Sequence, residues 1–362
     1  FWEKPKLRPL GAALANPRMP FYLLAYGLSI SMIALSVTDP LTRTIAISAA
    51  AGVYLLSTYL SRHPIWLYPS LLTVHLALLS FFTIEPSGKP ESYISLPFLG
   101  LTWVIALIGY AVSLRSPGPR ETVEDKYIFK IGRWGLNLRR IPSARYLFTF
   151  SWAQPLFLFV GLDILLWGGI ALFNPDTAII VCVGYTLLLA LFAMHWRDCP
   201  LAYGTLMGML LAVCLRLLGA SLDFPIIMAW IGGIGLGIYF IGLLVEQTVK
   251  ATKPKPSHLD VWPEPLRNFS VLLSTLAVLG TLPFAISYTT ACAAALAFAG
   301  ALYLAFAYRD RRYWLGYLGT GMLLLAWVMV LVMQDVRQPQ LYAIPFGLYL
   351  AGIGYLCLLY TS

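Results

Sequence analysis

Charged residues are scarce in this sequence of 362 residues: Asp, Glu, Lys and Arg make up 11% of it, and hydrophobic residues make up 59%. A soluble domain carries about 25% charged residues, so a water-soluble protein of this size could not cover its surface with so few. Lipid chains solvate apolar side chains directly, and a bilayer removes that requirement. The composition therefore excludes an ordinary soluble protein and indicates an integral membrane protein.

Motifs that carry chemistry are also missing. No two of the five cysteines have C-x-x-C spacing, so we interpret all five as small buried hydrophobic residues. The sequence contains no H-E-x-x-H, no G-x-S-x-G and no phosphate-binding G-x-x-x-x-G-K-[ST]. We predict no metal, no cofactor and no catalytic residue, and on balance no enzyme.

Long apolar stretches fill most of the chain, and each is long enough to cross a bilayer as an α-helix of about twenty residues. The first four are 20–38, 43–60, 65–84 and 93–114; the next four are 152–173, 177–194, 199–218 and 224–246; the last four are 269–287, 289–308, 313–333 and 341–360. The sequence thus predicts an all-α integral membrane protein with about twelve transmembrane helices.

The basic residues indicate how these spans are oriented. About 21 of the 25 Lys and Arg residues lie in alternate connections, whereas the opposite connections hold Arg43, Lys89 and Arg337. Because Lys and Arg are retained on the cytoplasmic side during insertion, we predict that both ends are cytoplasmic, in a bacterial-type inner membrane. The formal charge of +9 is spread over short clusters and forms no basic face, which argues against nucleic acid as a partner.

Two longer cytoplasmic segments divide the spans into three groups of four. The predicted organisation is an N-terminal segment (1–19), a first four-helix repeat (20–114), a basic interfacial linker (115–150), a second repeat (151–248), a Pro- and Lys-rich linker (249–268) and a third repeat (269–362). The chain starts without an initiator Met and ends directly after an apolar run, so both ends look cut from something longer.

The three groups resemble one another in sequence. At a constant shift of 248 positions Trp66 matches Trp314 (66 to 314), and Pro97-Phe98 matches Pro345-Phe346 (97 to 345). The middle group fits with small gaps, for example where Tyr203 matches Tyr317. An even number of spans per unit inserts every copy the same way up, so we predict three four-helix repeats of the same orientation.

A resemblance to a known type of protein rests on two features of this unit. One is the basic, Trp-containing turn in mid-unit (55–67 and 303–315), and the other is the closing segment PQLYAIPFGLYL at 339–350. The unit resembles the tandem-repeat polytopic membrane proteins of bacteria grouped under domains of unknown function. This resemblance covers most of the chain; it implies no activity and carries no site residues over.

Few ionisable residues lie inside the predicted spans. Asp163 and His75 lie near the middle of theirs, and Arg216 lies toward the outer end of its span. A carboxylate at mid-bilayer costs about 3 kcal/mol on insertion scales. Asp163 is therefore either a proton or cation site, with His75 as its neighbour, or one buried polar contact between helices, with a Tyr or with Arg216. For His75 we favour a packed histidine sharing a hydrogen bond, and Arg216 is near enough to the surface to snorkel.

Glycine spacing predicts close helix packing. Gly233 and Gly237 have G-x-x-x-G spacing, and Gly347 and Ala351 repeat the small-x-x-x-small pattern in the last span. Such spacing lets helix backbones approach closely in lipid. The alternative is a substrate path that opens beside flexible backbone.

Three functional classes remain open. The first is a structural, assembly or lipid-contacting membrane module, favoured by the small number of buried polar residues. The second is a secondary carrier or lipid-handling transporter that uses Asp163. The third is a membrane enzyme with its active groups in cytoplasmic loops or in missing parts of the chain. Membrane lipids are the expected partners, and other membrane subunits are further candidates.

Overall fold

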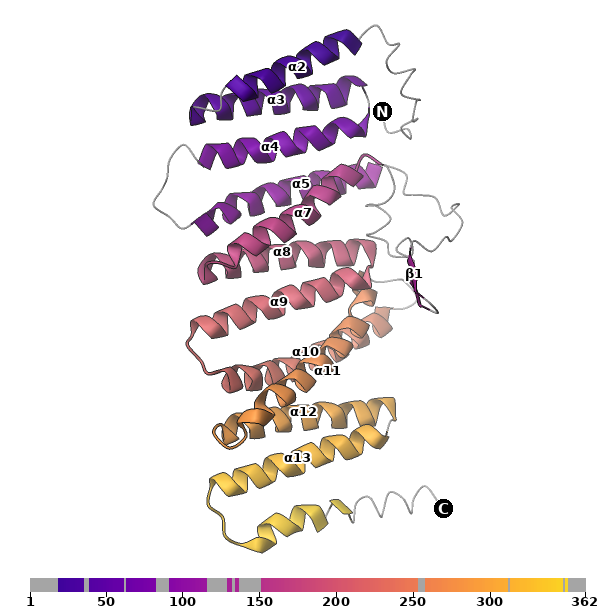
Figure 1. Cartoon of the computed structure of the whole chain (residues 1–362). Helices are drawn as coiled ribbons and strands as arrows, with labels where there is room; N and C mark the ends of the chain where they lie inside the picture. The colour runs from indigo at the N-terminus through magenta and orange to yellow at the C-terminus, as the bar shows by residue number, and fades with distance from the viewer. Residues whose placement is uncertain are drawn as a thin grey trace. The chain divides into compact units, whose positions relative to one another are not determined.

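A computed structural model describes residues 19–35, 39–61, 63–82, 91–115, 129–131, 134–136, 151–252, 258–311, 313–347 and 349–350. By their internal contacts, residues 1–189 and 190–362 form two compact units, and each is described here by itself. Helices dominate both units (Figure 1).

Among the described residues, the first unit contains five helices and most of a sixth. They are α2 (Met19–Leu35), α3 (Pro40–Ser61), α4 (Leu67–Phe82), α5 (Ser95–Arg115) and α7 (Gln154–Ala171), followed by most of α8 (Pro175–Trp196). Short 3-10 turns, η1 (Pro64–Trp66) and η2 (Glu91–Ile94), precede α4 and α5. Helix α3 packs against α2 and α4, while α7 packs against α5 and, less extensively, α4 (Figure 1).

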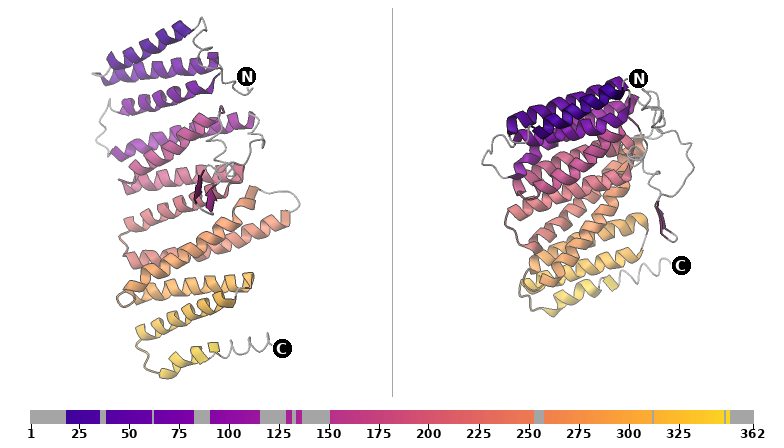
Figure 2. Two further views of the ribbon diagram at one scale, coloured as in Figure 1. Left: turned by 45° about the vertical axis from the view of Figure 1, so that its right-hand side comes forward. Right: turned by 45° about the horizontal axis from the view of Figure 1, so that its top comes forward.

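Among the described residues, the second unit contains the end of α8, five further long helices and a helical segment at 339–347 and 349–350. The five long helices are α9 (Cys199–Gly219), α10 (Phe224–Thr252), α11 (Pro263–Thr281), α12 (Thr289–Asp310) and α13 (Tyr313–Met333), with 3-10 turns η4 (His258–Val261) and η5 (Leu282–Phe284) at the two ends of α11. The closest pairs are α10 with α11 and α12 with α13. Both views of Figure 2 show α12 and α13 side by side.

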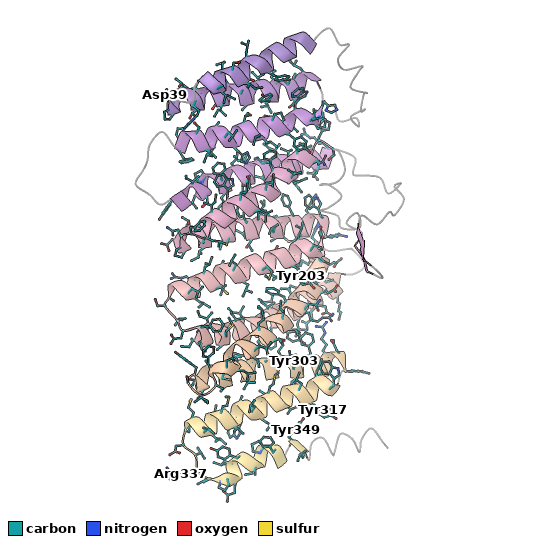
Figure 3. All side chains as sticks on the ribbon, viewed as in Figure 1. Asp39, Tyr203, Tyr303, Tyr317, Arg337 and Tyr349 are labelled. Atoms are coloured by element: carbon teal, nitrogen blue, oxygen red, sulfur yellow. The ribbon has the colours of Figure 1, made fainter. Side chains whose placement is uncertain are left out.

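Tyrosine hydroxyls and a charged cluster tie the helices of the second unit together. Figure 3 labels Tyr203 on α9, Tyr303 on α12 and Tyr317 on α13. The Tyr203 hydroxyl accepts a hydrogen bond from the Asn268 amide of α11 (2.8 Å), and the Tyr303 hydroxyl lies 2.9 Å from the Thr275 hydroxyl of α11. At the C-terminal ends of α10 and α12, Glu246 pairs with Lys250 (2.7 Å) and with Arg309.

One short antiparallel hairpin departs from the helical pattern. Strands β1 (Phe129–Ile131) and β2 (Trp134–Leu136) pair within the predicted linker 115–150. The sequence suggested a segment of mixed aromatic and basic residues on the inner leaflet but gave no indication of a hairpin. Apart from Arg115, which ends α5, the rest of that linker lies outside the described residues.

Ten of the described helices are long and apolar enough to cross a membrane. Large apolar side chains are exposed on these helices: Leu165 on α7, Leu244 on α10 and Val332 on α13 are 73%, 63% and 60% exposed within the chain. Only 22% of the apolar stretch of α9 and 28% of the apolar stretch of α13 are buried within the chain. Water would penalise this much exposed apolar surface, whereas lipid does not. The chain is therefore a multi-pass helical membrane protein.

The first and last predicted spans stand outside those ten helices. The span predicted at 20–38 corresponds to α2, of which 17 residues are described. The span predicted at 341–360 begins as helix at residues 339–347 and 349–350, and residues 351–362 lie outside the described part of the chain.

Candidate functional site

A polar cluster lies between helices of the first unit. Helix α4 contributes His75, α5 contributes Thr102 and α7 contributes Asp163. All three helices are apolar over most of their length, so these side chains face one another because lipid offers them no hydrogen-bond partner. The structure thus brings together Asp163 and His75, two of the three polar residues singled out in the sequence.

The Asp163 carboxylate is the centre of the cluster. Its two oxygens lie 2.9 and 3.0 Å from His75 Nε2. The Thr102 hydroxyl lies 2.9 Å from Oδ2 of the same carboxylate and 2.7 Å from the Phe98 carbonyl oxygen. On the other side of the imidazole ring, His75 Nδ1 lies 2.7 Å from the Leu71 carbonyl oxygen, one helical turn earlier. Every polar side-chain atom in this group therefore has a partner within the protein.

Aromatic side chains enclose the cluster. The His75 ring lies parallel to Phe98 (5.8 Å between ring centres) and is tilted against Phe159 (5.3 Å). Phe98 in turn stacks on Trp167. The Tyr185 hydroxyl of α8 donates to the backbone carbonyl of Asp163 (3.4 Å). The Asp163 and Thr102 side chains are buried, and the His75 side chain is 11% exposed.

The comparisons with known proteins add no candidate function. No family model, curated protein or solved structure matches this chain. Function is therefore inferred from the geometry of the chain itself.

A second contact, between α10 and α11, has the same form as the contact between α5 and α7. A Cβ atom placed on Gly109 of α5 would lie 3.2 Å from the Leu156 Cβ of α7. A Cβ atom placed on Gly242 of α10 would lie 3.2 Å from the Leu266 Cβ of α11. The two glycines are 133 positions apart (109 to 242), and the two leucines are 110 apart (156 to 266). We call these contacts the first junction (α5–α7) and the second junction (α10–α11).

Two further residues of each junction correspond at the same spacings. Thr102 corresponds to Gly235 (102 to 235), and Asp163 corresponds to Leu273 (163 to 273). In the second junction a Cβ atom on Gly235 would lie 3.1 Å from the Leu273 Cβ. At these positions, therefore, the second junction has a leucine packed against a glycine, whereas the first junction has an aspartate hydrogen-bonded to a threonine.

The third predicted polar residue, Arg216, lies elsewhere. It is exposed near the end of α9, in the second unit, and contributes nothing to the cluster in the first. Its position suits a side chain that reaches toward the membrane surface.

The glycines of α10 that contact neighbouring helices are not the same set as the pair predicted from the G-x-x-x-G spacing. Gly233 meets the ring of Phe298 on α12, but no atom lies within 4 Å of a Cβ placed on Gly237. A Cβ on Gly235 would lie 3.1 Å from the Ser270 carbonyl oxygen of α11, and a Cβ on Gly232, one turn earlier, would lie 3.1 Å from the Ala277 Cβ, so these two glycines face α11. A Cβ on Gly347 also meets open space, and Ala351 lies outside the described residues.

The sequence did not reveal Thr102 or Tyr185 as parts of the site. Thr102 lies in an apolar helix where its hydroxyl bonds to the carbonyl one turn earlier, and so gives no signal. Tyr185 gives no signal either, because a tyrosine ring in an apolar helix packs like any other aromatic side chain. Among the described residues no three metal-ligating side chains come together. The cluster offers one imidazole, one carboxyl and one hydroxyl group, which suits proton binding or a fixed helix–helix contact.

Proposed function

We propose that this protein is a structural, assembly-type membrane module that contacts lipid. The observation that carries the proposal is the closure of the Asp163 cluster. A mid-span carboxyl group whose oxygens are taken up by His75 and Thr102 serves as a joint between α4, α5 and α7. Hydrogen bonds of this kind hold helices together in lipid, where no hydrophobic force does so.

The proposal includes a threefold repeat of four helices, twelve spans in all. Its support is the regular spacing of helix ends. Helix α12 begins and ends 114 positions after α8 (175 to 289 and 196 to 310), and α13 begins and ends 114 positions after α9 (199 to 313 and 219 to 333). Helix α8 lies 135 positions after α3 at both ends (40 to 175 and 61 to 196).

The turns between these helices support the same repeat. Four non-glycine residues among those described have positive φ: Arg197, Ser221, Arg311 and Asp335, at 49–54°. Arg197 and Arg311 are 114 positions apart, as are Ser221 and Asp335. A left-handed residue is costly for any side chain with a Cβ atom, so its recurrence at one spacing favours a common turn design.

Orientation and location follow from the charge bias. The proposal places the N- and C-termini, the linkers 115–150 and 249–268, and the turns at Arg197 and Arg311 on the cytoplasmic side of a bacterial-type inner membrane. The Glu246, Lys250 and Arg309 cluster lies at the same end of its helices as Arg311, which is in keeping with this assignment.

Large exposed apolar faces make lipids, and other membrane subunits, the proposed partners. The test is purification of the tagged chain in a mild detergent from its native membrane. A scaffold yields co-purifying membrane proteins in fixed stoichiometry, and an Asp163→Leu variant with a broken joint yields less of them. Repeated recovery of a lone monomer contradicts an assembly role.

A secondary carrier that uses Asp163 is the second candidate. The second junction packs with Leu273 against Gly235 and needs no ionisable group, so the cluster in the first junction is not required by packing alone. Intramembrane carboxyl groups mark proton paths in carriers. The two candidates separate in proteoliposomes that contain an internal pH indicator. A scaffold shows equal proton flux for wild type and Asp163→Asn, whereas a carrier loses its flux in the variant.

A further inference from the structure

We propose that His75 and Asp163 together bind one proton, which is shared between His75 Nε2 and the Asp163 carboxyl group inside the membrane. This inference goes beyond the structural role and holds for a scaffold and a carrier alike. Its ligand is the proton itself.

The argument begins at the outer nitrogen of the imidazole ring. His75 Nδ1 lies 2.7 Å from the Leu71 carbonyl oxygen, and a carbonyl oxygen can only accept a hydrogen bond. Nδ1 must therefore carry a hydrogen and donate it. A neutral imidazole has one N–H, so a neutral His75 would leave Nε2 with only a lone pair.

That lone pair would face the carboxyl group of Asp163. Both carboxyl oxygens lie within 3.0 Å of Nε2, and an ionised carboxylate also has only lone pairs. Two acceptors cannot make a hydrogen bond with each other. One more proton must therefore lie between them, either on Nε2 (imidazolium with carboxylate) or on Asp163 (imidazole with carboxylic acid). Both arrangements have the same proton count and no net charge.

Neutrality is what the surroundings require. An isolated charge in the hydrocarbon core is costly, whereas a neutral pair with complete hydrogen bonds is tolerated. In the described part of the chain, the other side chains hydrogen-bonded to Asp163 are Thr102 of α5, through its hydroxyl, and Tyr185 of α8, which donates to the Asp163 backbone carbonyl. Neither supplies a formal charge at neutral pH, so the shared proton is the one that balances Asp163.

A metal cation is a poorer occupant of this place. Monovalent or divalent cations need several oxygen ligands, and the Asp163 oxygens already face His75 and Thr102. No further carboxyl group joins the cluster among the described residues. The proton needs only the one donor–acceptor pair that is present.

The Asp163→Asn variant provides a matched control. Asn has nearly the same shape, and its amide N–H donates to a neutral His75 Nε2 without an added proton. The purified protein is unfolded in strong detergent at pH 8. In the unfolded chain His75 is neutral and Asp163 is ionised, because the ordinary pKa values of the two side chains are about 6.5 and 3.9. The wild type should therefore release one proton per chain more than Asp163→Asn, measured with a pH indicator in weak buffer.

A second measurement uses the folded wild type alone, so it stands even if the variant does not fold. Nitrogen-15 NMR of His75 and the infrared carboxyl band of Asp163 are recorded on the folded protein in a mild detergent at pH 8. The expected result is an imidazolium with a carboxylate or a neutral imidazole with a carboxylic acid. A neutral imidazole with a carboxylate, an imidazolium with a carboxylic acid, or equal proton release from both proteins overturns the proposal.

Discussion

At the scale of single residues, the partner of an ionisable side chain decides whether the membrane tolerates it. Asp163 lies on a helix whose other faces meet lipid or apolar side chains, yet its carboxyl group has hydrogen-bond partners from two other helices. From the sequence we could identify Asp163 and His75 as ionisable residues near the middle of predicted spans and as possible neighbours. It could not supply Thr102 or Tyr185, because a threonine hydroxyl in a helix bonds to its own backbone wherever it points, and a tyrosine ring packs like any other aromatic side chain.

Removal of His75 should destabilise the contact between α4 and α7 more than removal of the Asp163 charge. His75→Leu leaves a buried carboxyl group with only Thr102 as its side-chain partner, whereas Asp163→Asn keeps a donor toward His75. We expect a loss of about 1–2 kcal/mol for His75→Leu and a smaller loss for Asp163→Asn. Reversible unfolding in mixed micelles measures both. Equal stability of wild type and His75→Leu would show that the hydrogen bond holds nothing together.

A second residue-scale prediction concerns the start of α3, outside the span. The backbone N–H of Thr42 donates to the Asp39 carboxylate (2.9 Å), and this hydrogen bond lowers the pKa of Asp39 from its ordinary value. A lowered pKa means that the ionised carboxylate stabilises the folded helix end. This stabilisation is present above the ordinary pKa of Asp39 and is lost as the pH falls through the lowered one.

Hydrogen exchange at the Thr42 amide tests this dependence. Protection of that amide, corrected for intrinsic exchange, should fall in the acid range in the wild type. In Asp39→Asn, which accepts the same hydrogen bond without titrating, protection should stay level. A parallel fall in both proteins would assign the effect to another group.

At the scale of helices, the sequence predicts where the spans lie more accurately than it predicts which helix faces are in contact. Apolar length predicted helices such as α9 and α13 to within a residue or so of their ends. The glycine register of α10 was less accurate, because G-x-x-x-G spacing indicates a face but not a neighbour. Helix α10 packs against both α11 and α12, and Gly235, rather than Gly237, meets α11. The β1–β2 hairpin was not predicted, since its strands are only three residues long.

Two glycines of α13 provide a matched test of close packing. A Cβ atom on Gly319 would lie 2.8 Å from the backbone oxygen of Gly300 and 3.0 Å from the backbone nitrogen of Leu304, both on α12. A Cβ atom on Gly321 would meet nothing within 4 Å. Gly319→Ala must push α12 and α13 apart, because backbone atoms cannot rotate away.

The expected difference is measurable by unfolding in mixed micelles. Gly319→Ala should lose about 1–3 kcal/mol, as overpacking of a tight contact does, while Gly321→Ala should be neutral or slightly stabilising because alanine favours helix. If both variants unfold alike, the α12–α13 contact is looser than described.

At the scale of the whole molecule, the account depends on a unit of four helices that recurs in one orientation. Short sequence matches and the charge bias led to this prediction, and the common spacing of helix ends and left-handed turns supports it within the described residues. The sequence could not show that two of the packed helix pairs, α5 with α7 and α10 with α11, join helices across the predicted linkers. In a repeat architecture this is expected, because a unit covers its apolar face with the next unit.

The most direct test of this central claim is the side of the membrane on which each mid-unit basic turn lies. The native cysteines are replaced, and single cysteines are placed at Arg62, Arg197 and Arg311. Cysteines at Lys89 and Arg337 serve as markers of the opposite side. Each variant is labelled with a membrane-impermeant thiol reagent in sealed vesicles of known orientation. The repeat predicts that all three turns react from the cytoplasmic side and both markers from the other. Reaction of any one turn together with the markers would contradict it.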